Sequence, residues 1–187
     1  LFMQEMGIGK VALIGHGLGA VISTLYAYRN PKWVDRMMAI GLPNGQHSVS
    51  PRLLNAHPTE LAEWLLSRTA DSEAVRIEAP KTDPRAIHHS LTNLQNIDMA
   101  SLPQYLTTPC LMVYGQNDPA LESQSGPDPN TGLPESSHQI VFEQSGHFPM
   151  LDEMNKFNRL VADFLALGSG SSPRQLQLKE EWKRRVR

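Results

Sequence analysis

The sequence predicts an α/β fold in three layers, α/β/α, built around a mostly parallel sheet. Two short apolar runs, KVALI at 10–14 and RMMAIGL at 36–42, are typical of parallel strands that are buried on both faces. Two more runs, TPCLMVYG at 108–115 and QIVF at 139–142, indicate a third and a fourth strand. Helical periodicity at 18–28 and 151–167 alternates with these runs, so we expect right-handed crossovers and helices on both faces of the sheet.

The helix expected at 151–167 has an amphipathic pattern. Its apolar residues share one face and should point to the sheet: Met154, Phe157, Leu160, Val161 and Phe164. A closing stretch, 168–187, starts with the glycine- and serine-rich GSGSS, which predicts a flexible hinge. Ser172 and Pro173 then have the pattern of a helix start.

This last helix would be basic, with an apolar stripe of Leu178, Trp182 and Val186 beside Lys183, Arg184, Arg185 and Arg187. Two interpretations stay open for it. The helix packs on its own domain through the tryptophan, or it is an interaction tail for another subunit or an acidic surface.

The chain divides into a core at 1–43, a helical segment at 44–106, a second core portion at 107–167 and the closing stretch at 168–187. Because 44–106 contains helical patterns and no evident strand, it is predicted to be a lid inserted after the second visible strand. A lid there lies above the C-terminal ends of the strands, where open α/β sheets bind ligands. Most of its apolar side chains should pack the lid on the sheet, while Leu61, Trp64 and Leu65 are candidates for lining a pocket for an apolar acyl or ring group.

Composition excludes several classes of function. The 187 residues carry a net charge of −2, so no nucleic-acid partner is expected. The single cysteine, Cys110, excludes an internal disulfide and favours a reducing compartment, hence a cytoplasmic location. No apolar run approaches the ~18 residues of a membrane span. The adjacent pair His88 and His89 would point ~100° apart on a helix, and the other histidines outside the site proposed below lack ligand spacing, so neither metal nor cofactor is expected.

Three positions follow the ends of predicted strands. Gly17 is the centre of GHGLG, at a turn between a strand and a helix. Asp118 follows the third strand in YGQND, and His147 follows the fourth in QSGHF. The C-terminal ends of parallel strands meet at one edge of a sheet, so these positions should lie together. Their order is that of a nucleophile, an acid and a histidine.

Up to Leu167 the sequence resembles the α/β-hydrolase superfamily. GHGLGA is similar to the GHSLGA turn that carries the nucleophile of this family, with glycine in place of serine. TTPCLMVYGQNDP resembles the strand that presents the acid, and SGHFPMLDE the loop that presents the histidine. The resemblance implies Ser-His-Asp acyl transfer on an ester-like bond of a small molecule.

The resemblance also implies a role for each position. Asp118 would accept a hydrogen bond from the ring of His147 and orient it, and the other ring nitrogen would be the general base. The backbone N–H of Leu18 would be half of an oxyanion hole. Gly17, at the nucleophile position, is expected to adopt a positive φ that keeps the turn but supplies no attacking oxygen, so this chain is predicted to be inactive or very weak.

Two alternatives stay open, a ligand-binding protein that has lost the chemistry and a cofactor-free enzyme that uses only His147 and Asp118. The sequence also departs from the family at its start, because the strand of the nucleophile turn begins near residue 10. The strand Val11–Ile14 would then be an open apolar edge. We expect either that the first strands of the fold belong to a missing N-terminal portion, or that another chain, such as a second copy, covers this edge.

Overall fold

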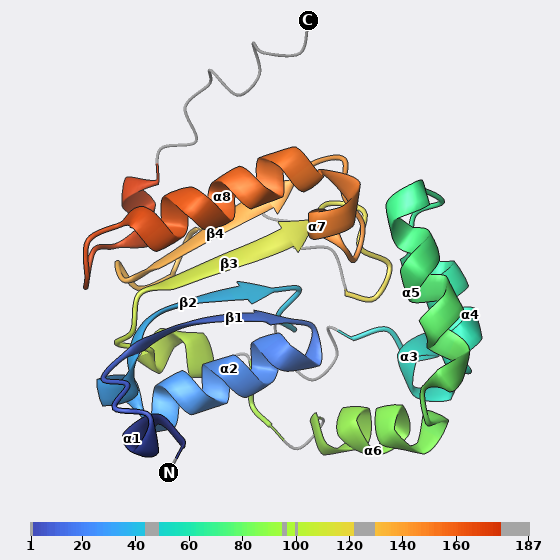
Figure 1. The fold of residues 1–187 in the computed structure, drawn as a ribbon, viewed down its shortest axis with the longest axis horizontal. Coiled ribbons are helices and arrows are strands. Elements are labelled where there is room, and N and C mark those ends of the chain that lie inside the picture. The colour runs from blue at the N-terminus through green and yellow to red at the C-terminus, as the bar shows by residue number, and fades with distance from the viewer. Residues whose placement is uncertain (1, 44–48, 95–96, 100, 122–129, 177–187) are drawn as a thin grey trace, which may run out of the picture.

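The computed structural model describes residues 2–43, 49–94, 97–99, 101–121 and 130–176, and its centre is a parallel sheet (Figure 1). The four strands are β1 (Val11–His16), β2 (Val34–Ile40), β3 (Cys110–Gly115) and β4 (Ser137–Phe142). They lie in the order β1-β2-β3-β4, with every neighbouring pair parallel. The predicted three-layer α/β fold is confirmed.

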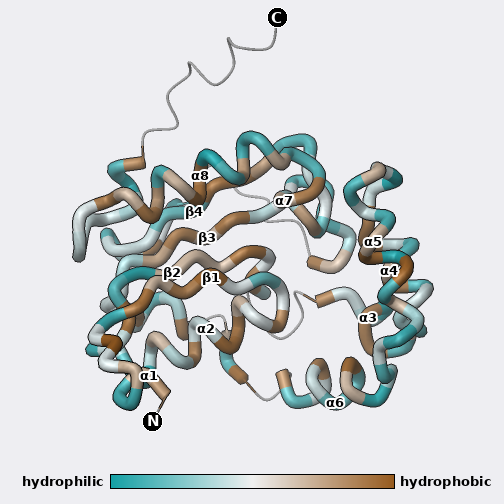
Figure 2. Tube along the Cα trace, viewed as in Figure 1, coloured by the Kyte–Doolittle hydropathy of each residue, from teal (hydrophilic) through white to brown (hydrophobic). Residues whose placement is uncertain are grey.

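Helices cover the two faces of the sheet, as Figure 1 shows with α2 (Leu18–Arg29) on one side and α8 (Met154–Ala166) on the other. Side chains alternate between the faces along each strand. Met37 and Met112 therefore belong to the core under α2, whereas Met38 and Leu111 belong to the core under α8. Figure 2 shows the hydrophobic colour concentrated along the strands.

Two predicted details of burial were wrong. Strand β1 is not buried on both faces, because it lies at the edge of the described sheet and contributes no residue to the core under α8, which packs over β2, β3 and β4. Ile14 pairs in register with Met38 and stays 45% exposed, and Ile22 on α2 is 58% exposed. On α8, Phe157, Leu160 and Phe164 are buried, but Met154 begins the helix and is 38% exposed.

The segment between β2 and β3 forms short helices beside the carboxyl ends of the strands (Figure 1). They are α3 (Arg52–Asn55), α4 (Pro58–Leu65), α5 (Glu73–Glu78) and α6 (Pro84–Leu94), with 3-10 turns at Ala70–Ser72, Ala79–Lys81 and Leu102–Tyr105. His57 and Glu60 cap the start of α4 reciprocally, and Pro58 stands at its first position. Within 49–94, 97–99 and 101–106 there is no strand, only a single bridge from Val49 to Leu121.

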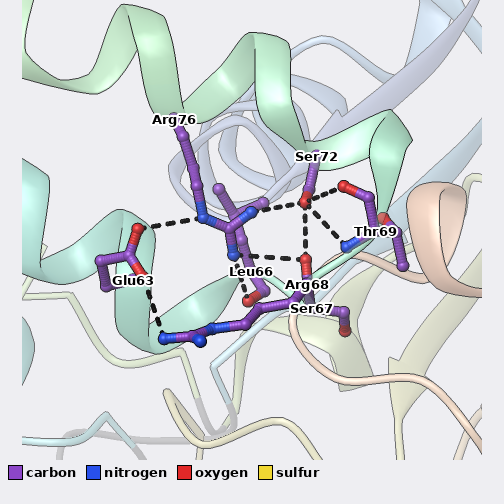
Figure 3. Close-up of polar contacts among 7 residues, drawn as sticks. All are labelled: Glu63, Leu66, Ser67, Arg68, Thr69, Ser72 and Arg76. Atoms are coloured by element: carbon purple, nitrogen blue, oxygen red, sulfur yellow. Dashed lines mark hydrogen bonds and ion pairs between the residues drawn. The ribbon is translucent and has the colours of Figure 1, made fainter.

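Arg76 ties α4 and α5 together, as Figure 3 shows. Its guanidinium donates to Glu63 Oε1 at 3.0 Å, to Ser72 Oγ at 2.6 Å and to the carbonyl oxygen of Leu66 at 3.0 Å. Ser72 Oγ in turn donates to the carbonyl oxygens of Ser67 and Thr69. The Arg76 side chain is only 14% exposed, so one largely buried cation organises this corner of the predicted lid.

Beyond α8, residues 168–176 lie against the loop before β4. Ser169 donates to Asp35, and Ser172 donates to the carbonyl oxygen of Glu135. Arg174 donates to the carbonyl oxygens of Leu133, Pro134 and Ser137. Ser172 caps a 3-10 turn at Pro173–Gln175, as its sequence pattern predicts.

Leu178, Trp182, Val186 and the basic residues of the predicted last helix lie outside the described residues. In the described part of the chain, no helix has the length and apolar character needed to cross a membrane.

Candidate active site

Gly17 forms the sharp turn between β1 and α2. Its φ of 54° and ψ of −118° confirm the predicted positive φ, which glycine adopts without the steric cost that a side chain brings. The turn is fixed by two backbone contacts: the Gly17 N–H donates to the carbonyl oxygen of Ile40 at 2.9 Å, and its own carbonyl accepts from Ala20 at 3.0 Å.

Asp118 and His147 meet beside this turn. His147 Nδ1 lies 2.9 Å from Asp118 Oδ2, and the two side chains are only 12% and 5% exposed. The second oxygen of Asp118 accepts the Ala120 N–H at 2.8 Å. A Cβ built on Gly17 would lie 3.9 Å from His147 Nε2, with no other neighbour within 4 Å. The fold therefore brings the three predicted positions together.

The loop that carries His147 is packed closely on the end of β3. A Cβ on Gly115 would lie 1.9 Å from the carbonyl oxygen of Gly146, so only glycine fits there. Below the loop, Ser145 Oγ donates to Glu153 Oε2 at 2.7 Å and the Gly146 N–H donates to Asp152 Oδ2 at 2.8 Å.

The carboxylate of Glu153 is itself held in the charged form. Burial opposes this by raising its pKa, but the hydrogen bonds from Ser145 and Lys156 more than offset burial, and the net effect is a lowered pKa. An ionised Glu153 keeps accepting from the Ser145 hydroxyl, which anchors the histidine loop from beneath.

His16, the last residue of β1, is a part of the site that sequence reasoning missed. Its Nε2 lies 2.8 Å from the carbonyl oxygen of His147, and the two rings are 4.7 Å apart between centroids. Burial and the neighbouring His147 lower the pKa of His16 to about 4, so its ring is neutral at pH 7. In the neutral tautomer that carries its proton on Nε2, His16 donates a hydrogen bond to the carbonyl oxygen of His147. This bond fixes the position of the His147 backbone. The only sequence signal is its place beside Gly17, since the contact spans 131 residues.

Leu18 is the first residue of α2, so its N–H precedes the first bonds inside the helix, which start with Ala20 and Val21 donating to Gly17. It lies at the positive end of the helix dipole, beside the turn. This is the environment that the predicted oxyanion role requires.

A cavity of about 360 Å³ opens beside the turn and reaches both Gly17 and His147. It is lined by Gly17, Leu18, Gly41, Pro43, Val49, Leu53, Ala86, Ile87, Ser90, Leu91, Leu94, Ala120, Leu121 and His147.

The three lid residues proposed from the sequence are not in this lining. Leu61 is buried within the lid at 7% exposure, and the Arg52 guanidinium lies 4.7 Å over the ring of Trp64. Leu65, the last residue of α4, is half-buried but does not line the cavity either. The wall comes from α3 and α6 because these two helices pack against each other and face the strand ends.

Other reactive groups lie away from this chemistry. Burial raises the pKa of the Cys110 thiol to about 12, which keeps it protonated at the start of β3. Ser145 is fully buried and donates to Glu153. Across the described ranges, no group of three or more His, Cys, Asp or Glu side chains is arranged to hold a metal ion.

Comparison with curated proteins adds two similar relatives. A 2-hydroxy-6-oxononadienedioate/2-hydroxy-6-oxononatrienedioate hydrolase of Pseudomonas putida is 27% identical, over 87% of this chain and 65% of the relative. A pimeloyl-[acyl-carrier protein] methyl ester esterase of Vibrio parahaemolyticus is 24% identical, over 83% of this chain and 70% of the relative. The chain thus spans about two thirds of the length of these proteins.

Solved structures share the fold. The 2-hydroxy-6-oxo-6-phenylhexa-2,4-dienoate hydrolase of Rhodococcus sp. strain RHA1 superposes with a TM-score of 0.69 at 15% identity, covering 88% of this chain and 67% of that one. A thermophilic esterase of Thermogutta terrifontis has a TM-score of 0.69 at 17% identity, covering 88% and 68%. The model of the alpha/beta hydrolase family matches residues 1–160. The chain therefore belongs to the alpha/beta hydrolase family.

Proposed function

We propose that this site is built for ester hydrolysis by acyl transfer, and that Gly17 leaves the present chain without the attacking oxygen. The observation that carries the proposal is the position of a Cβ on Gly17, 3.9 Å from His147 Nε2 with open space around it. In a rotamer that points to His147, an oxygen one bond beyond that Cβ can reach the ~2.6–3.2 Å at which a general base takes a proton. The esterase among the relatives supports the same reaction class.

The chemistry follows from the contacts. An oxygen at position 17 would attack the ester carbonyl carbon while its proton moves to His147 Nε2, and Asp118 would stabilise the imidazolium through Nδ1. The Leu18 N–H would donate to the carbonyl oxygen as that oxygen becomes negative. The proton on Nε2 would then pass to the leaving alkoxide, and water would release the acid from the acyl intermediate.

The substitution Gly17→Ser tests this proposal with a hexanoate ester as the substrate. Gly17→Ala is its matched control, because it places a Cβ in the same strained turn without an oxygen. We expect G17S to exceed both G17A and the unmodified chain by at least ~10³-fold in kcat/KM, and the added change His147→Ala to abolish the gain. Equal rates for G17S and G17A, with both folded, would contradict the proposal.

A second candidate is hydrolysis by water that His147 activates directly. It is favoured by the intact contact between His147 and Asp118 and by the open position that Nε2 faces. In a serine protease, binding and the oxyanion hole alone retain a ~10³–10⁴-fold acceleration over water. A slow turnover of the unmodified chain that His147→Ala removes would support this candidate, and a rate unchanged by His147→Ala would dismiss it.

A further inference from the structure

One wall of the cavity comes from one face of α6. Ile87, Ser90, Leu91 and Leu94 are spaced by three and four residues, so they share a face of the helix, and all four line the cavity. Leu53 of α3 and Leu121 beyond β3 complete this apolar wall. The helix is otherwise exposed, with no fully buried residue, so its packing consists mainly of this wall.

The described lining offers no partner for a negative charge at the far end of the cavity. None of its residues is lysine or arginine, and the hydroxyl of Ser90 already donates to the carbonyl oxygen of Ala86 at 2.7 Å. His147 is engaged with Asp118 at the reacting end.

We propose that the site selects an uncharged, apolar acyl chain, which lies along Leu53 and the α6 face, and discriminates against a chain that ends in a carboxylate. This inference rests on the proposed function, because the reacting carbonyl fixes one end of the ligand between the Leu18 N–H and His147. The other end then lies against leucine and isoleucine side chains. A carboxylate loses its hydration there and gains neither a cation nor a free hydroxyl donor in return.

Methyl hexanoate and monomethyl adipate make a matched pair of probes, since they differ only in a terminal methyl group or carboxylate. NMR titration of the unmodified chain at pH 7.5 measures both affinities without turnover by an attacking serine. We expect methyl hexanoate to bind at least ten-fold more tightly. Equal affinities, tighter binding of the adipate ester or failure of methyl hexanoate to bind would overturn the proposal.

Two lysine variants on α6 test whether the acyl chain lies along the lining face of this helix. Leu91→Lys puts a cation on the lining face, whereas Asn93→Lys puts the same charge on an exposed position two residues away. We expect L91K to weaken methyl hexanoate and strengthen monomethyl adipate, each by at least five-fold, and N93K to change neither. Unchanged selectivity in L91K, with helical content retained by circular dichroism, would contradict the proposed position of the chain.

Turnover by the G17S chain separates the two proposals. If G17S hydrolyses neither ester while the unmodified chain still prefers methyl hexanoate, the proposed function fails and the ligand class stands. If G17S hydrolyses both esters with equal kcat/KM, the proposed function stands and the selectivity fails.

Discussion

The site at the strand ends and the helical segment beside it, 49–94, which the sequence predicts to be a lid, are held in different ways. Around Gly17, Asp118 and His147, backbone groups approach so closely that Gly115 has no room for a Cβ, and the polar contacts are short and mostly buried. In the lid, α3, α5 and α6 have no fully buried residue, and one arginine-centred network joins α4 to α5 (Figure 3).

The two regions would serve different purposes: the residues at the strand ends would carry the chemistry, and helix α6 would determine which ligand binds. Groups that must keep fixed distances to a reacting atom are placed by the sheet, whose strands pair in parallel and pack against a hydrophobic core on each face. Helix α6, to which we assign the choice of ligand, is placed by a few contacts at the surface of the molecule. We therefore expect substitutions in the first region to change the stability of the whole domain, and substitutions in the second to change local opening and ligand preference.

The largest effect on stability is expected from Gly115→Ala. The added Cβ would lie 1.9 Å from the Gly146 carbonyl oxygen and 2.6 Å from that of Ser145, so β3 and the histidine loop would have to separate. We expect a loss of about 3 kcal/mol or more in the free energy of unfolding, at the upper end of overpacking. Urea denaturation measures it against Gly9→Ala, whose Cβ meets nothing within 4 Å. Equal stability of the two variants would show that the loop is not held by this approach.

A smaller effect is expected from His16 as the pH falls. Because burial lowers its folded pKa to about 4 from 6.5, the unfolded chain binds a proton between those values and the folded chain does not. Stability therefore falls as the pH drops through this window, by about 3 kcal/mol in total.

The His16→Gln variant isolates this contribution. Glutamine retains a side-chain N–H donor but has no titrating ring, so urea midpoints for H16Q should depend less on pH between 6.5 and 4. A dependence as steep as that of the unmodified chain would exclude His16 as the source. Asp35 and Glu153, whose pKa values are lowered, lose their stabilisation at lower pH, near and below ~4.

The smallest global effect is expected from Arg76→Met in the lid. Removing the guanidinium leaves the carbonyl oxygen of Leu66 without its donor, at a cost of about 1–2 kcal/mol. Hydrogen exchange should quicken in α4 and α5 and stay constant in β2 and β3. Arg85→Met is the matched control, because Arg85 is exposed and its partner among the described residues is Asp83, and it should leave exchange unchanged. Uniform acceleration across the sheet in R76M would mean that the lid and the core unfold as one unit.

Much of the sheet and the three strand-end positions could be predicted from the sequence, because their signals are local. Apolar runs mark the strands, and Gly17, Asp118 and His147 each follow such a run directly. Parallel pairing then brings the strand ends to one edge of the sheet without further information. The positive φ at Gly17 was predictable for the same reason, since a strand passes into a helix there within one residue.

The lining of the cavity could not be predicted in this way. Leu61 and Trp64 are apolar and lie in the predicted lid, yet the face that each helix turns to the site depends on packing between helices. The role of His16 depends on a contact with a residue 131 positions away. The exposure of Ile14 depends on which strands α8 covers. The sequence pattern of β1 alone does not indicate this.

The most direct test of the account is covalent labelling at position 17 by a fluorophosphonate, which reports an activated oxygen without any substrate selectivity. Intact-mass spectrometry should find one adduct per chain on G17S, mapped by peptide analysis to position 17, and none on the unmodified chain or on G17S combined with His147→Ala. Absence of an adduct on folded G17S would contradict the claim that this chain retains the geometry for attack and lacks only the oxygen.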